Sequence, residues 1–243
     1  MSQASSLARY SPWQFRDFAV DRGLSILIIG LLWGYALIEP VRRAVGSSLP
    51  GTASPLWLVA MQVSSAIVSV SVLIALNGIV SADRKAGYYR FLFSKPVSPV
   101  FFYAQLFFVY MVGVLAAMLV LSSLLHRMLP TFSIPYFLLY TALVYVAMGG
   151  IGFFLSVTTR YDWLSLAAVW LGARVLRGLY GAGNDWRSKL VELLPPVHKL
   201  DDVANSLIAT GSAHLADVVW LFGYGALFFA LGLAALRWGS LAD

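Results

Sequence analysis

The stretch SADRKAGYYRFLFSKPVSP, residues 81–99, separates two long apolar runs and decides how the chain is interpreted. The first apolar run ends at Val80, and the second follows the stretch directly. Within the stretch, basic residues alternate with tyrosine and phenylalanine. Because Pro96 and Pro99 cannot continue a helix, we expect a short helix over 84–93 that lies along the membrane and then turns into the next span. The stretch therefore predicts a basic, aromatic surface between two membrane spans.

The composition is that of a polytopic membrane protein. Hydrophobic residues make up 60% of the 243 residues and charged residues only 12%, whereas a soluble domain carries about 25% charged residues. Several uncharged runs approach the roughly 20 residues that cross a bilayer as a helix. The net charge of +6 comes from basic residues that flank these runs, which favours topology signals and lipid contacts over nucleic-acid binding. The chain has no cysteine, so disulfide and thiolate chemistry are excluded.

We expect an all-α membrane protein that forms a single transmembrane domain over residues 1–243. The six predicted spans are residues 23–38, 56–80, 100–125, 136–159, 163–180 and 215–238. A short interfacial helix over 10–21 is expected before them, with Ser11 as its cap and Pro12 in its first turn; an irregular leader is the alternative. The region 181–217 is expected to hold short helices before the last span.

Polar residues recur at helical spacing in the second predicted span. Gln62, Ser65 and Ser69 lie three and four residues apart, so they share one helix face. Polar side chains at this depth face protein or water rather than lipid tails. Two interpretations remain open: these residues line a transport path, or they join neighbouring helices through hydrogen bonds.

Glycines and arginines distinguish the fourth and fifth predicted spans. Gly149, Gly150 and Gly152 lack side chains, which predicts the close approach of another helix. Arg174 and Arg177 lie toward the far end of the fifth span, where they reach either the lipid headgroups or a water-filled vestibule. Of these two positions, we expect the headgroup region.

The distribution of lysine and arginine predicts the orientation. With the N-terminus inside the cell, the inner segments hold nine of the 17 basic residues and the outer segments six, as the positive-inside rule expects. Six spans then place both termini in the cytoplasm. The stretch 81–99 becomes the largest inner loop, and 181–217 becomes the largest outer region.

The inner loop resembles that of type-2 ABC exporter permeases. In that family an acidic residue lies four positions before a glycine, and an apolar helix then leads to a proline, an aliphatic residue and a serine or threonine. The residues that match this pattern position by position are Asp83, Gly87, Pro96, Val97 and Ser98. The resemblance extends over nearly the whole chain, through the N-terminal amphipathic helix, six spans, an outer helical region and an LLPP sequence at 193–196. The chain departs from the pattern at Tyr88, where a small hydroxyl residue is usual, and at Asp83, where glutamate is usual.

The resemblance implies the permease subunit of an ABC transporter in the cytoplasmic (inner) membrane. Such a subunit contacts lipid, pairs with a second permease chain as a homodimer or heterodimer, and recruits two copies of an ABC ATPase subunit that binds ATP and Mg. The implied coupling helix contacts the ATPase through Asp83, Arg84, Gly87, Tyr88, Arg90, Phe91 and Pro96. The implied substrate path between protomers is lined by Gln62, Ser65, Ser69, Asn77 and Trp170. The alternative for the basic loop is contact with anionic lipid alone, worth about 1 kcal/mol for each basic residue.

No catalytic site is expected in this chain. It contains neither a G-x-x-x-x-G-K-[ST] nor an H-E-x-x-H pattern. Ordinary surface positions are expected for the three histidines, and an exposed helix start is expected for Asp201 and Asp202. Few charges lie within the spans, which favours export of a hydrophobic or amphipathic substrate. The alternative function is that of a structural or enzymatic membrane subunit without an ATPase partner.

Overall fold

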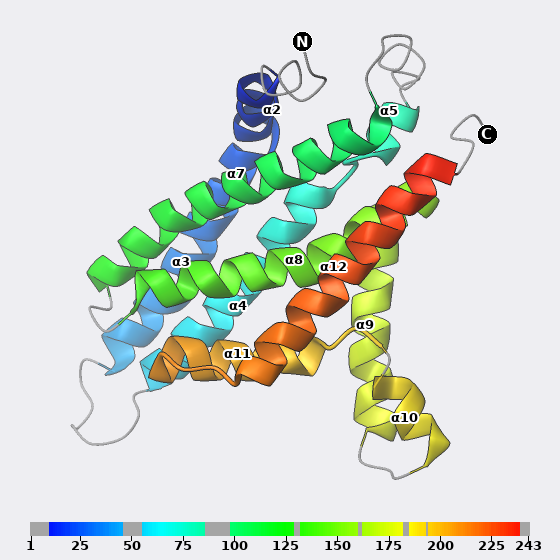
Figure 1. Ribbon diagram of the computed structural model, residues 1–243. Helices are drawn as coiled ribbons and strands as arrows, with labels where there is room; N and C mark the ends of the chain where they lie inside the picture. Colours follow the sequence, from blue (N-terminus) through cyan, green and yellow to red (C-terminus); the bar gives the residue numbers. More distant parts are fainter. Residues whose placement is uncertain are drawn as a thin grey trace.

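The computed structural model describes residues 10–45, 55–85, 98–128, 132–159, 162–181, 185–192 and 194–238, and these ranges contain helices and no strand (Figure 1). The elements are α2 (Ser11–Phe18), η1 (Ala19–Gly23), α3 (Leu24–Val45), α4 (Pro55–Leu76), α5 (Ser81–Lys85), α7 (Pro99–Met128), α8 (Ile134–Thr158), α9 (Asp162–Tyr180), α10 (Trp186–Glu192), α11 (Val197–Thr210) and α12 (Leu215–Trp238). An all-α architecture is therefore confirmed for the described part of the chain.

Within the described ranges, five helical segments are long and apolar enough to cross a membrane. They are Ser11–Ala36, Gln62–Asp83, Pro99–Arg127, Ile134–Thr158 and Leu215–Trp238. The helix at the predicted fifth span, α9, is not among them. Its 19 residues include Arg174 and Arg177, which lower its hydropathy. The protein thus has the character of a multi-pass membrane protein, and the sixth span stays a prediction.

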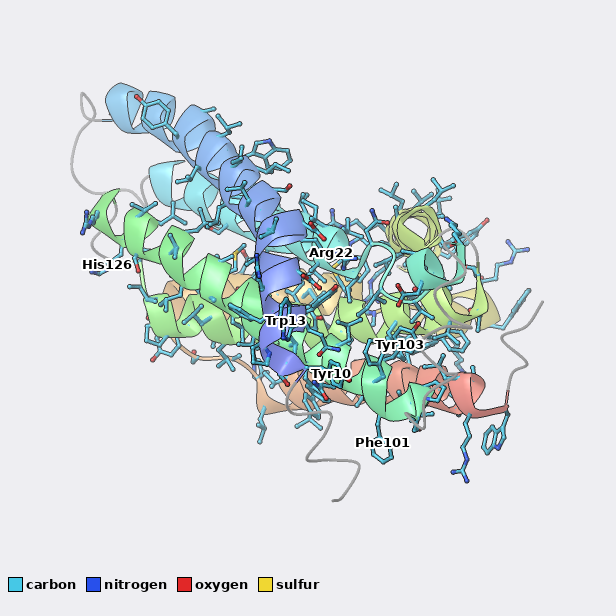
Figure 2. All side chains as sticks on the ribbon, turned by 90° about the horizontal axis from the view of Figure 1, so that it is seen from above. Tyr10, Trp13, Arg22, Phe101, Tyr103 and His126 are labelled. Atoms are coloured by element: carbon cyan, nitrogen blue, oxygen red, sulfur yellow. The ribbon has the colours of Figure 1, made fainter. Side chains whose placement is uncertain are left out.

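The N-terminal helix runs without a break into the first long helix. The single π-helical turn η1 joins α2 to α3, and the ribbon changes direction near this turn in Figures 1 and 2. The helix expected at the start of the chain is present, but the capping role predicted for Ser11 is wrong. Tyr10 occupies the N-cap position without a side-chain cap, and the Ser11 hydroxyl instead accepts a hydrogen bond of 2.8 Å from Nε2 of Gln105.

Helix α8 lies at the centre of the molecule and packs against α4, α7, α9, α11 and α12. The close approach predicted for its glycines is confirmed. A Cβ atom on Gly150 would overlap the backbone carbonyl of Gly225 on α12, and one on Gly149 would lie 3.2 Å from the Phe107 ring on α7. The hydroxyl of the buried Tyr145 donates a hydrogen bond of 2.9 Å to the Phe107 carbonyl. Backbone contact and buried aromatic packing therefore fix α8 against its neighbours.

The two ends of the molecule carry different short helices. Figure 1 shows α2, α5 and the C-terminal end of α12 at one end, and α10 and α11 at the other. The short helices predicted within 181–217 are thus present as α10 and α11. Gly211 ends α11 in the left-handed conformation, with φ of 70°, which a residue without a Cβ adopts at little cost.

Candidate functional site

A cavity of about 620 Å³ is formed by α3, α4, α9 and α11. Its lining combines indole rings, small apolar side chains and polar or charged groups. The lining residues are Trp33, Gln62, Ser65, Ala66, Ser69, Val70, Trp170, Arg174, Asp201, Ala204 and Asn205. Four of the five residues implied for the substrate path, from two helices far apart in the sequence, therefore line one cavity.

The division of α4 into two faces explains why its polar residues reach the cavity. Val68 and Val72 are fully buried in the core, and packing of this apolar face leaves Gln62, Ser65 and Ser69 on the cavity side. Ser65 also makes a hydrogen bond of 2.9 Å with the hydroxyl of Tyr140 on α8. One serine thus lines the cavity and joins two helices, so the two interpretations of the polar face are compatible.

An ion pair bridges α9 and α11 at the cavity wall. Nη2 of Arg174 donates hydrogen bonds of 3.1 and 2.9 Å to the two carboxylate oxygens of Asp201. The side chains are 55% and 46% exposed, so solvent weakens their attraction and the pair contributes no more than about 1 kcal/mol. Arg174 lies at a cavity, which fits the vestibule alternative. Asp201 is the fifth residue of α11 and pairs with arginine, so its expected place at an exposed helix start is wrong.

Asn77 does not join the other residues implied for the path. Helix α4 ends at Leu76, and Asn77 is exposed in the turn that follows. Gly78, the next residue, adopts a positive φ of 74°, so the chain leaves the helical direction directly after Asn77. Asn77 is therefore not part of the cavity lining, and its place on a substrate path stays a prediction.

The described part of the segment 81–99 is anchored to the helix that follows it. The Tyr103 hydroxyl on α7 donates a hydrogen bond of 3.1 Å to Oδ2 of Asp83 on α5, and Tyr103 is labelled in Figure 2. The backbone of Arg84 is helical within α5. The remaining residues implied for ATPase coupling lie outside the described residues; they are Gly87, Tyr88, Arg90, Phe91 and Pro96.

Arg22 links the N-terminal helix to this same region. Its Nη1 donates a hydrogen bond to the Ala75 carbonyl near the end of α4, and its guanidinium lies 4.6 Å from the centre of the Tyr110 ring on α7. Figure 2 shows Arg22 at the turn where the N-terminal ribbon changes direction. One side chain from η1 therefore contacts both helices that flank the loop.

Among the residues of the cavity wall that the sequence prediction missed are Trp33, Asp201 and Asn205. The last two lie four residues apart and so share a face of α11, just as Trp170 and Arg174 share a face of α9. This equal spacing of polar and aromatic residues on the two helices was the signal by which the sequence could have indicated the cavity wall.

Comparisons of the chain with protein-family models, with curated proteins and with solved structures give no match.

Proposed function

We propose that the chain is the membrane-spanning permease subunit of an ABC exporter, driven by ATP that a separate subunit hydrolyses. The observation that carries the proposal is the cavity between α4 and α9. The resemblance of the inner loop implied a path lined by the second and fifth spans, and Gln62, Ser65, Ser69 and Trp170 line a single cavity between those helices. A mixed polar and apolar lining suits an amphipathic substrate.

The proposal includes six spans, with α9 as the fifth, in the cytoplasmic membrane. An even number of spans requires both ends of the chain to lie on one side. The described ends of the chain, at α2 and α12, lie at the same end of the molecule in Figure 1, which supports an even number. The lysine and arginine distribution supports a cytoplasmic position for that end.

In the proposed mechanism, the segment 81–99 serves as the coupling helix and its flanks. The hydrogen bond between Asp83 and Tyr103 joins the end of the segment nearest α4 to the start of α7. A force on the segment would therefore reach both flanking spans. Closure of two ATPase subunits on ATP would tilt these spans and change access to the path, as a ligand-biased two-state element does. A second permease chain would complete the path.

Copurification tests the proposal. The tagged chain is purified from its host in mild detergent, and the proteins bound to it are identified by mass spectrometry. We expect a stoichiometric soluble ATPase with the native chain and its loss with Phe91→Asp, because a carboxylate would oppose burial of this aromatic position. Trp186→Asp is the matched control: its side chain is 67% exposed on α10, at the other end of the molecule, and the ATPase should remain bound.

A chain that copurifies with no ATPase, even after chemical cross-linking, would contradict the proposal. That result would favour the second candidate, a structural or enzymatic membrane subunit. The observation on that side is the hydrogen bond of 2.9 Å between Ser65 and Tyr140, which shows that part of the polar face of α4 joins helices.

A further inference from the structure

A second, smaller cavity adjoins the first. It measures about 270 Å³ and is lined by Ala173, Arg174, Arg177, Gly178, Val191, Pro195, His198 and Asp201. Arg174 and Asp201 line both cavities. A molecule that fills the larger cavity would therefore meet the charged groups of the smaller one.

The smaller cavity has an excess of positive charge. The guanidinium of Arg174 is paired with the carboxylate of Asp201 at 2.9 Å. Arg177 has no acidic partner within ion-pair distance among the described residues, and it supplies the unbalanced charge. Guanidinium groups bind carboxylates and phosphates through paired hydrogen bonds, so this charge favours an anionic group in the cavity.

His198 adds a polar group to the same wall. Its Nδ1 atom is buried and has no hydrogen-bond partner within the described part of the chain. Burial and, to a smaller extent, the positive charge of Arg177 lower the pKa of the imidazole below its ordinary value. The ring is therefore neutral near neutral pH and carries one N–H donor. Because Nδ1 is buried, a hydrogen bond to an anionic oxygen in the cavity would come from the tautomer that carries its proton on Nε2.

Along the wall that α9 contributes to the two cavities, an apolar part lies next to a positively charged part. Trp170, Arg174 and Arg177 lie four and three residues apart on one face of α9, and Trp170 and Arg177 are separated by about 10 Å along its axis. The indole of Trp33 and the side chains of Ala66 and Val70 complete the apolar lining of the larger cavity. The two cavities together therefore offer an apolar surface with a cationic site beside it.

We infer that the two cavities bind an amphiphile with an anionic headgroup, whose charge lies beside Arg174, Arg177 and His198 and whose tail lies along Trp33 and Trp170. As a statement about the exported substrate, the inference rests on the proposed function. As a statement about binding, it is tested without an ATPase.

Fluorescence quenching tests the binding. The full chain in maltoside micelles is titrated with phosphatidylglycerol carrying brominated tails, and separately with phosphatidylcholine carrying the same tails. Bromine quenches the fluorescence of nearby indoles. The same titration is repeated with a Trp33→Phe/Trp170→Phe variant, and the quenching that this variant loses is the signal of the two cavity indoles. We expect this signal to saturate at a mole fraction of phosphatidylglycerol about fivefold lower than that of phosphatidylcholine. The reason is that one basic group near the headgroup contributes about 1 kcal/mol.

Two variants should change this preference in opposite directions. Arg177→Gln should weaken binding of the anionic lipid about fivefold, and Asp201→Asn should strengthen it by a similar factor, because it removes the competing carboxylate beside Arg174. The matched controls are Arg187→Gln on α10 and Asp17→Asn on α2, which line neither cavity and should leave both titrations unchanged. A gain of affinity with Asp201→Asn cannot result from misfolding, so the test survives an unstable Arg177 variant.

Equal quenching by the two lipids at the cavity indoles would overturn the inference. So would an unchanged preference in both cavity variants. A third titration uses inorganic phosphate as a competitor: if phosphate alone abolishes the anionic preference while lipid tails still quench, the site binds a free anion rather than an amphiphile, and the inference is wrong. An anionic preference without a copurifying ATPase would contradict the proposed function alone, whereas an ATPase without this preference would contradict the inference alone.

Discussion

At the scale of single residues, glycines determine how closely the helices approach. Gly225 on α12 lies against the Val146 carbonyl of α8, and a Cβ atom there would overlap it. We predict that Gly225→Ala destabilises the protein by about 1–3 kcal/mol, as overpacking does elsewhere, and lowers its midpoint of thermal unfolding in detergent. Gly223 is the matched control on the same helix, since nothing lies within 4 Å of a Cβ atom at this position.

Gly223→Ala should leave the unfolding midpoint unchanged or raise it, because alanine is the better helix former by about 1 kcal/mol. Both midpoints are read from intrinsic tryptophan fluorescence during heating. Equal midpoints for the two variants would show that α8 and α12 do not approach as closely at Gly225 as the structure indicates.

Single residues also show what sequence reasoning can reach. The close contact at Gly150 was predictable, because a cluster of small residues in an apolar run has one common structural use. The pairing of Arg174 with Asp201 was not predictable from either residue. It depends on how α9 and α11 approach each other, and the two residues lie 27 positions apart along the sequence. Spacing within each helix shows which residues share a face, but not which faces meet.

At the scale of helices, the start of α7 holds the short helix α5. Tyr103 is fully buried, and its hydroxyl donates to Asp83. We predict that Tyr103→Phe weakens the attachment of α5 by about 1.5 kcal/mol, as expected when a hydrogen bond to a charged group is lost. Amide hydrogen exchange within Ser81–Lys85 should then be about tenfold faster. The folded protein is labelled in deuterated buffer and then digested, and the peptides are analysed by mass spectrometry.

Tyr35→Phe is the matched control for the exchange measurement, because Tyr35 is 64% exposed on α3. Exchange in α5 should not respond to it. Unchanged exchange in the Tyr103→Phe variant would mean that other contacts hold α5 in place. In that case the proposed transfer of force through Asp83 and Tyr103 would lose its physical basis.

The N-terminal helix illustrates the limit of sequence reasoning about elements. Polar and aromatic residues alternate over 10–21, which predicted a surface helix separate from the first span. No residue there ends a helix, and the chain continues through η1 into α3. The contacts of Arg22 depend on this continuity, because the turn places its guanidinium against Tyr110 and the end of α4. Amphipathic pattern predicted the helix, whereas its junction depends on tertiary contacts.

At the scale of the whole molecule, α9 decides the topology. Six spans place the described ends of the chain on the same side of the membrane, and five spans place them on opposite sides. Of the two arginines that lower the hydropathy of α9, Arg174 lines both cavities and Arg177 lines the smaller one. A span that carries binding groups has a weaker hydrophobic signal than one that only contacts lipid. The helix least certain from composition is therefore the one that contributes both arginines of the proposed site.

The absence of cysteine from the sequence makes this topology directly measurable. Single-cysteine variants at Ala82, Trp186 and Trp238, all exposed, are labelled with a membrane-impermeant maleimide in right-side-out and inside-out vesicles. If α9 crosses the membrane, Ala82→Cys and Trp238→Cys react only in inside-out vesicles and Trp186→Cys only in right-side-out vesicles. If α9 does not cross, Trp186→Cys reacts from the same side as Ala82→Cys and Trp238→Cys from the other. That second pattern would place α10 and α11 in the cytoplasm and would rule out the two cavities as the outer part of an export path.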